Sequence, residues 1–406
     1  MASPGPIHLA VALEGAGWHP AAWREPRSRP LELTSPGYWT DVVTTAEHAL
    51  LDFVTIEDSF AVPGTTVVDQ ELRTDRVRVR LDAHLIAARV APRTRNIGLI
   101  PTITTAHTEP FHVSKSVATL DYTSHGRAGW QVKVSGGPGE STHFGRRLTP
   151  HLTEADLAQL HGGALPRHYA ELFDDANDHV EVVRRLWDSW EDGAEIRDVE
   201  NRRFIDRGKL HRIDFEGAHF SVRGPSITPR PPQGQPVVAV LGHQRVPYEL
   251  AARSGDILFV TPADDVQARL ILDDVRTAEA AVGRTGERLR VYADVVVFLD
   301  SGTERGADRL RRLDEVSGSE FSSDAVLFTG SADDLAEQLA SWQALGFDGF
   351  RLRPGVIVDD LEIIDSALVP TLQKRGSFRT AYTESTLRGT VGLPTSVPNR
   401  YAAQQG

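Results

Sequence analysis

The chain has 406 residues, of which 40% are hydrophobic and 25% are charged, so it can bury a large core in one decorated domain or in two domains. Its net charge of −12 argues against nucleic acid as a partner, and the lack of cysteine excludes disulfides, thiolate nucleophiles and cysteine metal sites. The first 13 residues carry no basic segment, and the apolar runs are far shorter than a membrane span, so we expect a cytoplasmic protein without membrane contact.

Short apolar strands alternate with helix-period segments along the whole chain, which is typical of parallel strands joined by helical crossovers. The expected strands are residues 7–13, 53–57, 96–102, 128–135, 237–240, 257–260, 291–297 and 349–352. The expected helices are residues 38–50, 82–90, 111–123, 169–190, 247–254, 264–282, 333–345 and 359–374. Eight such units without a linker predict an α/β fold, a (β/α)8 TIM barrel formed by a single domain over residues 1–406.

The length beyond a minimal barrel falls into four insertions and a tail. The insertions follow strand 1 (15–36), strand 4 (136–167) and strand 7 (300–330), and one precedes strand 5 (193–235). Residues 376–406 form an extended C-terminal tail that we expect to wrap the barrel or a neighbouring subunit. Since three insertions follow strand ends, we expect the active site at the carboxyl ends of the strands.

Several common site motifs are missing from the sequence. The pair Gly15 and Gly17 lacks the third glycine of a dinucleotide fingerprint, because Pro20 stands there. The glycine-rich residues 135–141 lack the lysine of a phosphate-binding loop. The 15 histidines form no spaced ligand motif, so we expect no metal site, and no Gly-x-Ser-x-Gly elbow is present.

Residues 116–130 carry a leucine–aspartate pair, a serine, glycine–arginine and glycine–tryptophan, and in this order they resemble the luciferase-like flavin monooxygenases. Further segments are similar to the group of nitrilotriacetate monooxygenase component A and dibenzothiophene sulfone monooxygenase. These segments are residues 186–192, 220–225, 232–237, 348–350, 369–376, 386–388 and 393–394. The resemblance therefore extends over nearly the whole chain.

The resemblance implies a two-component monooxygenase. Reduced FMN (FMNH2) from a separate flavin reductase would react with molecular oxygen and oxygenate a small organic substrate, while the protein binds, orients and excludes water. It also implies a homodimer or tetramer. Two alternatives stay open: a deazaflavin-dependent hydride-transfer oxidoreductase, and a catalytically inactive flavin-fold subunit that serves as a binding or scaffold protein.

Five candidate cofactor residues lie on or after strands 2, 3 and 4. Asp58 resembles the family residue against the flavin ring edge, although an aspartate there also caps turns. Thr102 and Thr104 offer hydroxyls to the polar edge of the ring, although threonine is common in strands. Gln131 stands where the group has asparagine and reaches one methylene farther, and Ser135 matches a later serine of that strand.

The other candidate cofactor residues concern the flavin phosphate. Tyr169 resembles a tyrosine that reaches the phosphate or ribityl chain. Gly242, His243 and Gln244 lie between a strand and a helix, where exposed amides and the helix dipole suit a phosphate. The group has a glycine and two serines at these positions, whereas this chain has His243 and Gln244 in place of the serines. Binding of the cofactor is therefore the implied property to test.

The remaining candidates concern substrate and catalysis. The loop after strand 1 resembles the substrate loop of the group, so Trp18 and Trp23 are candidate substrate contacts, together with Phe60. His19 in this loop and His107 after strand 3 are candidate catalytic residues, because an imidazole titrates near neutral pH.

Overall fold

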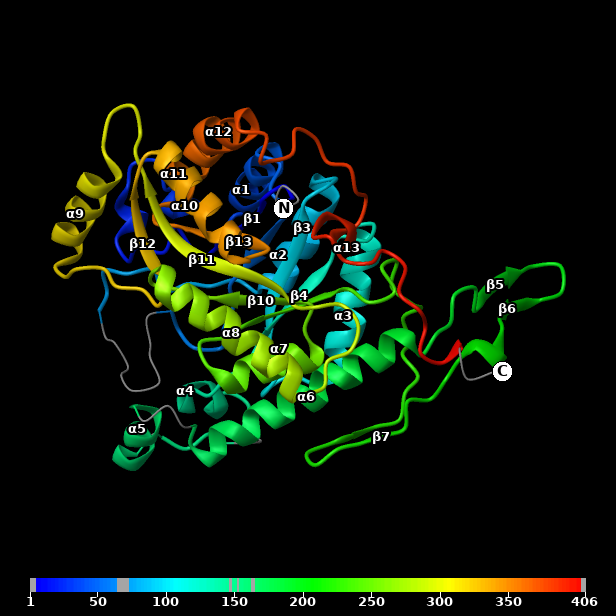
Figure 1. Ribbon diagram of the computed structural model, residues 1–406. Coiled ribbons are helices and arrows are strands. Elements are labelled where there is room, and N and C mark those ends of the chain that lie inside the picture. The colour runs from blue at the N-terminus through cyan, green and yellow to red at the C-terminus, as the bar shows by residue number, and fades with distance from the viewer. Residues whose placement is uncertain (1–4, 64–72, 146–147, 152, 162–164, 403–406) are drawn as a thin grey trace.

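Eight parallel strands close into a barrel with helices around it (Figure 1), which confirms the predicted (β/α)8 architecture. The computed structural model describes residues 5–63, 73–145, 148–151, 153–161 and 165–402. Residues 146–147, 152 and 162–164 of the insertion predicted after strand 4, and residues 403–406 of the tail, lie outside these ranges. Around the barrel the strands are β1 (His8–Leu13), β2 (Phe53–Ile56), β3 (Gly98–Thr104), β4 (Gly129–Lys133), β9 (Val237–Leu241), β10 (Ile257–Val260), β11 (Arg290–Leu299) and β13 (Gly349–Pro354). Pairing of β13 with β1 and of β10 with β11 closes the ring.

The outer ring consists of the predicted helices, and local capping fixes where several of them begin. The Asp82 side chain accepts a hydrogen bond from the Leu85 amide, and Ser331 and Asp334 form a capping box. The ring helices are α1 (Pro36–His48), α2 (Ala83–Val90), α3 (Pro110–Thr123), α6 (Arg167–Asp188), α7 (Arg245–Ser254), α8 (Asp265–Ala281), α10 (Ala332–Leu345), α11 (Ile357–Ile363) and α12 (Val369–Lys374).

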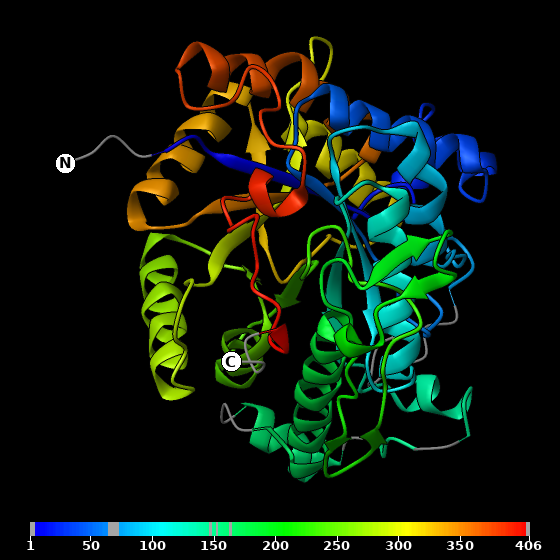
Figure 2. The same ribbon diagram turned by 90° about the vertical axis from the view of Figure 1, so that its right-hand side faces the viewer.

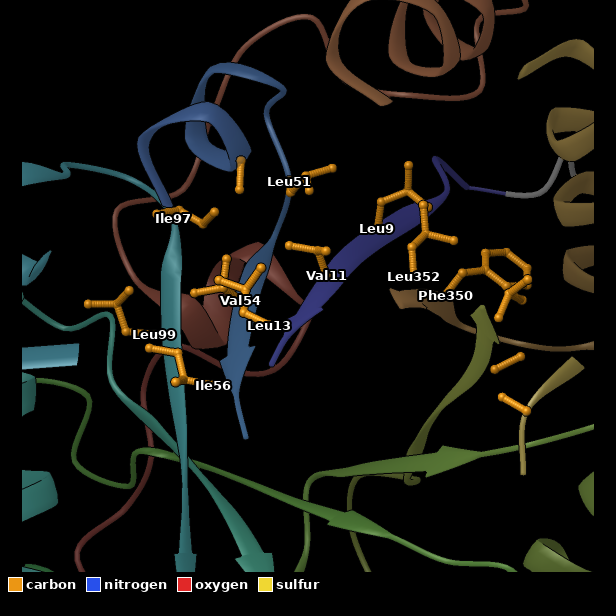
Figure 3. Close-up of a cluster of buried hydrophobic side chains, with 14 of the residues drawn as sticks. Leu9, Val11, Leu13, Leu51, Val54, Ile56, Ile97, Leu99, Phe350 and Leu352 are labelled. Atoms are coloured by element: carbon orange, nitrogen blue, oxygen red, sulfur yellow. The ribbon is translucent and has the colours of Figure 1, made fainter. Parts of the chain in front are cut away.

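The main apolar core lies between the outer face of the barrel and the helices. Alternate residues of each strand point outward, so Leu9, Val11 and Leu13 of β1 pack beside Val54 and Ile56 of β2. Figure 3 shows this layer continuing to β3 and β13. The inward positions are left to a second set of residues. Those near the amino ends of the strands form an apolar layer, and those near the carboxyl ends form the candidate site.

The C-terminal tail closes the bottom of the barrel, at the amino ends of the strands. Its short helix α13 (Leu387–Thr390) lies across that end in Figure 2. Leu387 is fully buried there with Phe53, Ile100 and Phe259, and Gly98 makes room for it, because a Cβ at that glycine would lie 2.4 Å from the leucine Cδ1. The tail thus wraps the barrel, one of the two arrangements expected from the sequence.

We expect Leu387→Ala to lower the free energy of unfolding by about 2–5 kcal/mol, since the cavity left under the barrel cannot collapse easily. Urea denaturation would measure this change. Leu31→Ala is the matched control, because Leu31 is 96% exposed and its truncation should change stability little. Equal effects of the two substitutions would contradict the role given to the tail.

Some elements differ from the sequence-based expectation. A ninth parallel strand, β12 (Val326–Gly330), pairs with the end of β11, and α9 (Gly306–Ser317) precedes it. The insertion before β9 contains two hairpins, β5 (Glu195–Asp198) with β6 (Arg203–Ile205) and β7 (Phe215–Glu216) with β8 (Ser221–Val222). They project from the barrel on the side away from α9 (Figure 1). The expected helix 359–374 is interrupted by a π-helical segment, Ile364–Leu368.

Short helices α4 (Pro138–Thr142) and α5 (Glu154–His161) occupy the insertion after β4. None of the helices in the described ranges is both long and apolar enough to cross a membrane. In the same ranges, no group of three or more histidine, aspartate or glutamate side chains is placed to hold a metal ion.

Candidate functional site

The carboxyl ends of β3 and β4 bring together three of the predicted cofactor residues. Thr102 and Thr104 are in register with Gln131 and Lys133. Residues paired in register lie on the same side of a sheet, and the contact of Gln131 with Arg351 across the barrel shows that this side faces inward. The site therefore has a polar inner wall on two adjacent strands.

A buried ionic network, which we did not predict from the sequence, fills the centre of the barrel beside this wall. The Arg351 guanidinium donates to Asp294 Oδ1 at 2.8 Å, to Gln131 Oε1 at 2.6 Å and to Glu57 Oε1 at 3.4 Å. Gln131 Nε2 in turn donates to Glu57 Oε2 at 3.1 Å. The side chains of Arg351 and Asp294 are 1% and 0% exposed. Each member has a partner, as burial of charge requires, and the network joins β2, β4, β11 and β13.

Arg353, two residues further along β13, extends this network toward the mouth of the barrel. It contacts Asp294, donates to Asp324 Oδ1 at 2.6 Å and lies 4.6 Å from the centroid of the Trp18 ring. Burial acts to lower the pKa of Arg353, but the carboxylates of Asp294 and Asp324 outweigh it, so the pKa lies above its ordinary value. The guanidinium stays charged and holds the Trp18 ring by a cation–π contact.

Three hydroxyls at this end of the barrel are buried without a partner anywhere in the described ranges. They belong to Thr102, Thr104 and Ser135. Buried hydroxyls are ordinarily hydrogen-bonded, and unpaired ones call for an explanation such as a ligand. The polar edge of a flavin ring carries both acceptors and a donor, so these hydroxyls fit that group.

Asp58 and Tyr169 already have partners in the protein. Asp58 accepts hydrogen bonds from the amides of Ser59 at 2.7 Å and Ala83 at 2.9 Å, which anchors the start of α2, and burial raises its pKa. The Tyr169 hydroxyl donates to the Gly136 carbonyl at 3.0 Å. A Cβ on Gly136 would lie 2.3 Å from the Tyr169 ring, so only glycine allows this contact.

Gly242, His243 and Gln244 precede helix α7, whose N-terminus receives no side-chain cap. His243 Nδ1 lies 2.9 Å from the Thr261 hydroxyl, and its Nε2 lies 3.5 Å from Asp324 Oδ2. Arg245, which follows, is paired with Glu249 on the helix surface. The loop thus has uncapped helix amides that suit an anion, while the His243 side chain is engaged with Thr261 and Asp324.

The structure separates the predicted substrate residues into two places. Trp18, Trp23 and His19 line one pocket. Phe60 lines another, together with Thr102 and Thr104. The Phe60 and His107 rings both contact Phe144, with centroids 4.7 and 4.9 Å away. His107 is therefore near the cofactor wall, whereas His19 is on the opposite side of the mouth.

Both ring nitrogens of His19 have partners within the protein, one in the loop that follows β1 and one on α9. Nδ1 accepts a hydrogen bond from the Ala21 amide at 3.0 Å, and Nε2 lies 3.1 Å from Asp314 Oδ1. Burial lowers the pKa of His19, and the contact with Asp314 offsets this only in part. The side chain is 1% exposed, so this geometry favours a loop-anchoring role over proton transfer to a substrate.

Comparisons with known proteins agree with this architecture. The family described as luciferase-like monooxygenase matches residues 18–348. Nitrilotriacetate monooxygenase component A of Aminobacter aminovorans is 29% identical over 95% of this chain and 96% of its own. Dibenzothiophene-sulfone monooxygenase of Rhodococcus erythropolis is 24% identical over 92% and 93%. A riboflavin lyase, solved with modified FMN and riboflavin, superposes with a TM-score of 0.81 at 22% identity and covers 95% of this chain and 96% of its own. The family expected from residues 116–130 is confirmed.

Proposed function

Because the chain belongs to the luciferase-like monooxygenase family, we propose that it oxygenates a small organic molecule with FMNH2, which a separate reductase supplies, and with molecular oxygen. The bound flavin would supply the two electrons and two protons with which one oxygen atom enters the substrate and the other leaves as water. The observation that carries the proposal is the set of unpaired hydroxyls of Thr102 and Thr104 on the inner wall and of Ser135, two residues beyond the end of β4.

Each part of the site has a task in this proposal. Thr102, Thr104 and Ser135 hold the polar edge of the flavin ring, and Gln131, fixed between Glu57 and Arg351, orients it. The uncapped amides at the start of α7 hold the phosphate. FMN supplies the redox chemistry, and the protein binds, orients and shields the reacting atoms from water.

An anaerobic titration with reduced FMN, run beside one with oxidised FMN, tests this proposal. We expect saturable binding of reduced FMN, and uptake of one oxygen molecule per bound flavin when oxygen is admitted. Binding of neither form would refute it, and binding of a deazaflavin instead would support hydride transfer. The proposal includes a homodimer or larger assembly, which a monomeric mass in light scattering would contradict.

We expect the double substitution Thr102→Val and Thr104→Val to weaken FMN binding about 10-fold or more, because two hydrogen bonds to the ring edge are lost while the side-chain shape is kept. Fluorescence quenching would measure the affinity. Riboflavin should lose affinity by the same factor, since it has the same ring. Thr44→Val on the exposed face of α1 is the control, and an unchanged FMN affinity in the double variant would contradict this role.

A further inference from the structure

The pocket beside the β1 loop has a mostly aromatic and aliphatic lining. Three indoles, Trp18, Trp23 and Trp39, line it together with Val77 and Ile86. Its volume is about 200 Å³, which suits a small molecule. Glu57 also lines it, so the pocket opens directly onto the ionic network at the barrel centre and hence onto the wall proposed to hold the flavin.

The charged groups in this lining already have partners within the protein. Arg80 is paired with Glu14, Glu57 contacts Arg351 and Gln131, and Arg76 also has a partner. A bound carboxylate or ammonium group would have to compete with these contacts or stay unpaired in a buried site, which is costly. The pocket therefore selects against strongly charged molecules.

One polar atom distinguishes the three indoles. The Trp23 N–H donates to the Asp75 carbonyl at 3.0 Å, and the Trp39 N–H donates to the Leu33 carbonyl at 2.9 Å. The Trp18 N–H is buried and has no acceptor in the described part of the chain. A buried indole N–H normally finds a partner, so Trp18 offers a donor to a ligand.

Trp18 is also held more firmly than a residue in a surface loop would be. Its backbone amide donates to the Pro354 carbonyl at 3.0 Å, and Arg353 packs against its ring. Gly17 permits this close approach, because its φ is +147° and a Cβ there would lie 2.2 Å from the Gly355 carbonyl oxygen. The donor is therefore fixed relative to the carboxyl end of β13.

We propose that this pocket binds the substrate, and that the substrate is an uncharged aromatic molecule whose hydrogen-bond acceptor receives the Trp18 N–H. The indoles contact the ring of the substrate, and the Trp18 N–H sets its orientation toward Glu57 and the barrel centre. This inference rests on the proposed function, since it names the substrate class of that same site.

Isothermal titration calorimetry on the full-length protein tests the proposal with three probes: 1-indanone, its hydrocarbon analogue indane, and nitrilotriacetate. We expect 1-indanone to bind about 5- to 30-fold more tightly than indane, the value of one buried hydrogen bond, and nitrilotriacetate not to bind saturably. Trp18→Phe should remove the preference for the ketone. Trp23→Phe is the matched control, because its N–H is satisfied within the protein, and it should keep the preference.

Saturable binding of nitrilotriacetate, equal binding of the ketone and the hydrocarbon, or a preference that survives Trp18→Phe would overturn the substrate class. Absence of binding of all three probes to a protein that binds FMN would also overturn it, and would leave the monooxygenase proposal intact. A protein that binds 1-indanone as expected but binds neither form of FMN would refute the cofactor and leave the pocket assignment standing.

Discussion

Replacing Arg351 with methionine is expected to lower the free energy of unfolding by about 3–5 kcal/mol, because Asp294 and Glu57 lose a cation inside the barrel. The Asp294 side chain is 0% exposed, so solvent cannot take the place of the guanidinium. Methionine keeps most of the side-chain volume, which separates loss of charge pairing from loss of packing. Urea denaturation at neutral pH measures the change.

Arg311→Met is the matched control for this experiment. Arg311 is paired with Asp308 on the surface of α9, with side chains 70% and 46% exposed. An exposed pair contributes about 0–1 kcal/mol, so the control should stay near the parent stability. Equal losses in the two variants would show that the barrel network contributes no more to stability than a surface pair.

Substituting Gly242 with valine is expected to lower FMN affinity about 100-fold or more, since the phosphate would lose two charge-assisted hydrogen bonds from the start of α7. A Cβ at this position would lie 3.0 Å from Pro247 Cβ and from the Tyr248 ring, so a branched side chain must displace the first turn of the helix. Equilibrium titration with oxidised FMN measures the effect.

Riboflavin is the internal control, because it shares the ring and lacks the phosphate. Its affinity for Gly242→Val should stay within a few-fold of the parent value if the α7 loop holds only the phosphate. A parallel loss for riboflavin would mean that the substitution disturbs the ring wall as well, and an unchanged FMN affinity would place the phosphate elsewhere.

The barrel could be predicted from the sequence because the residues of its strands that face the surrounding helices are apolar. Phe350 and Leu352 face the helices and are fully buried, as are most of the outward residues of the other barrel strands. Strand β12 was missed because it is an added edge: its residues are only partly buried, and it pairs with β11 alone. The interruption of the last helix had a sequence signal in Pro370, which lacks the amide hydrogen of an α-helical bond. We overlooked it because Ile364 and Leu368 fit a regular α-helical pattern.

The positions of the candidate site residues were predicted in part. The buried ionic network beside them was not predicted. Thr102, Thr104 and Gln131 lie together on the inner wall, where strand position placed them. Arg351 and Arg353 went unnoticed, because an arginine in one sequence usually indicates a solvated surface. Their alternation with Phe350 and Leu352 was the available signal, since charged residues two apart in a buried barrel strand must both face the interior.

The position of Leu387 under the barrel has a consequence for the order of folding. The first strand pairs with β13, and the apolar bottom layer is covered only when α13 arrives. Almost the entire chain must therefore leave the ribosome before the layer that contains Phe53 and Phe259 is shielded from water. Contacts so distant in sequence form late and slowly, so we expect the bottom layer to stay exposed until residues 387–390 have been synthesised and have docked.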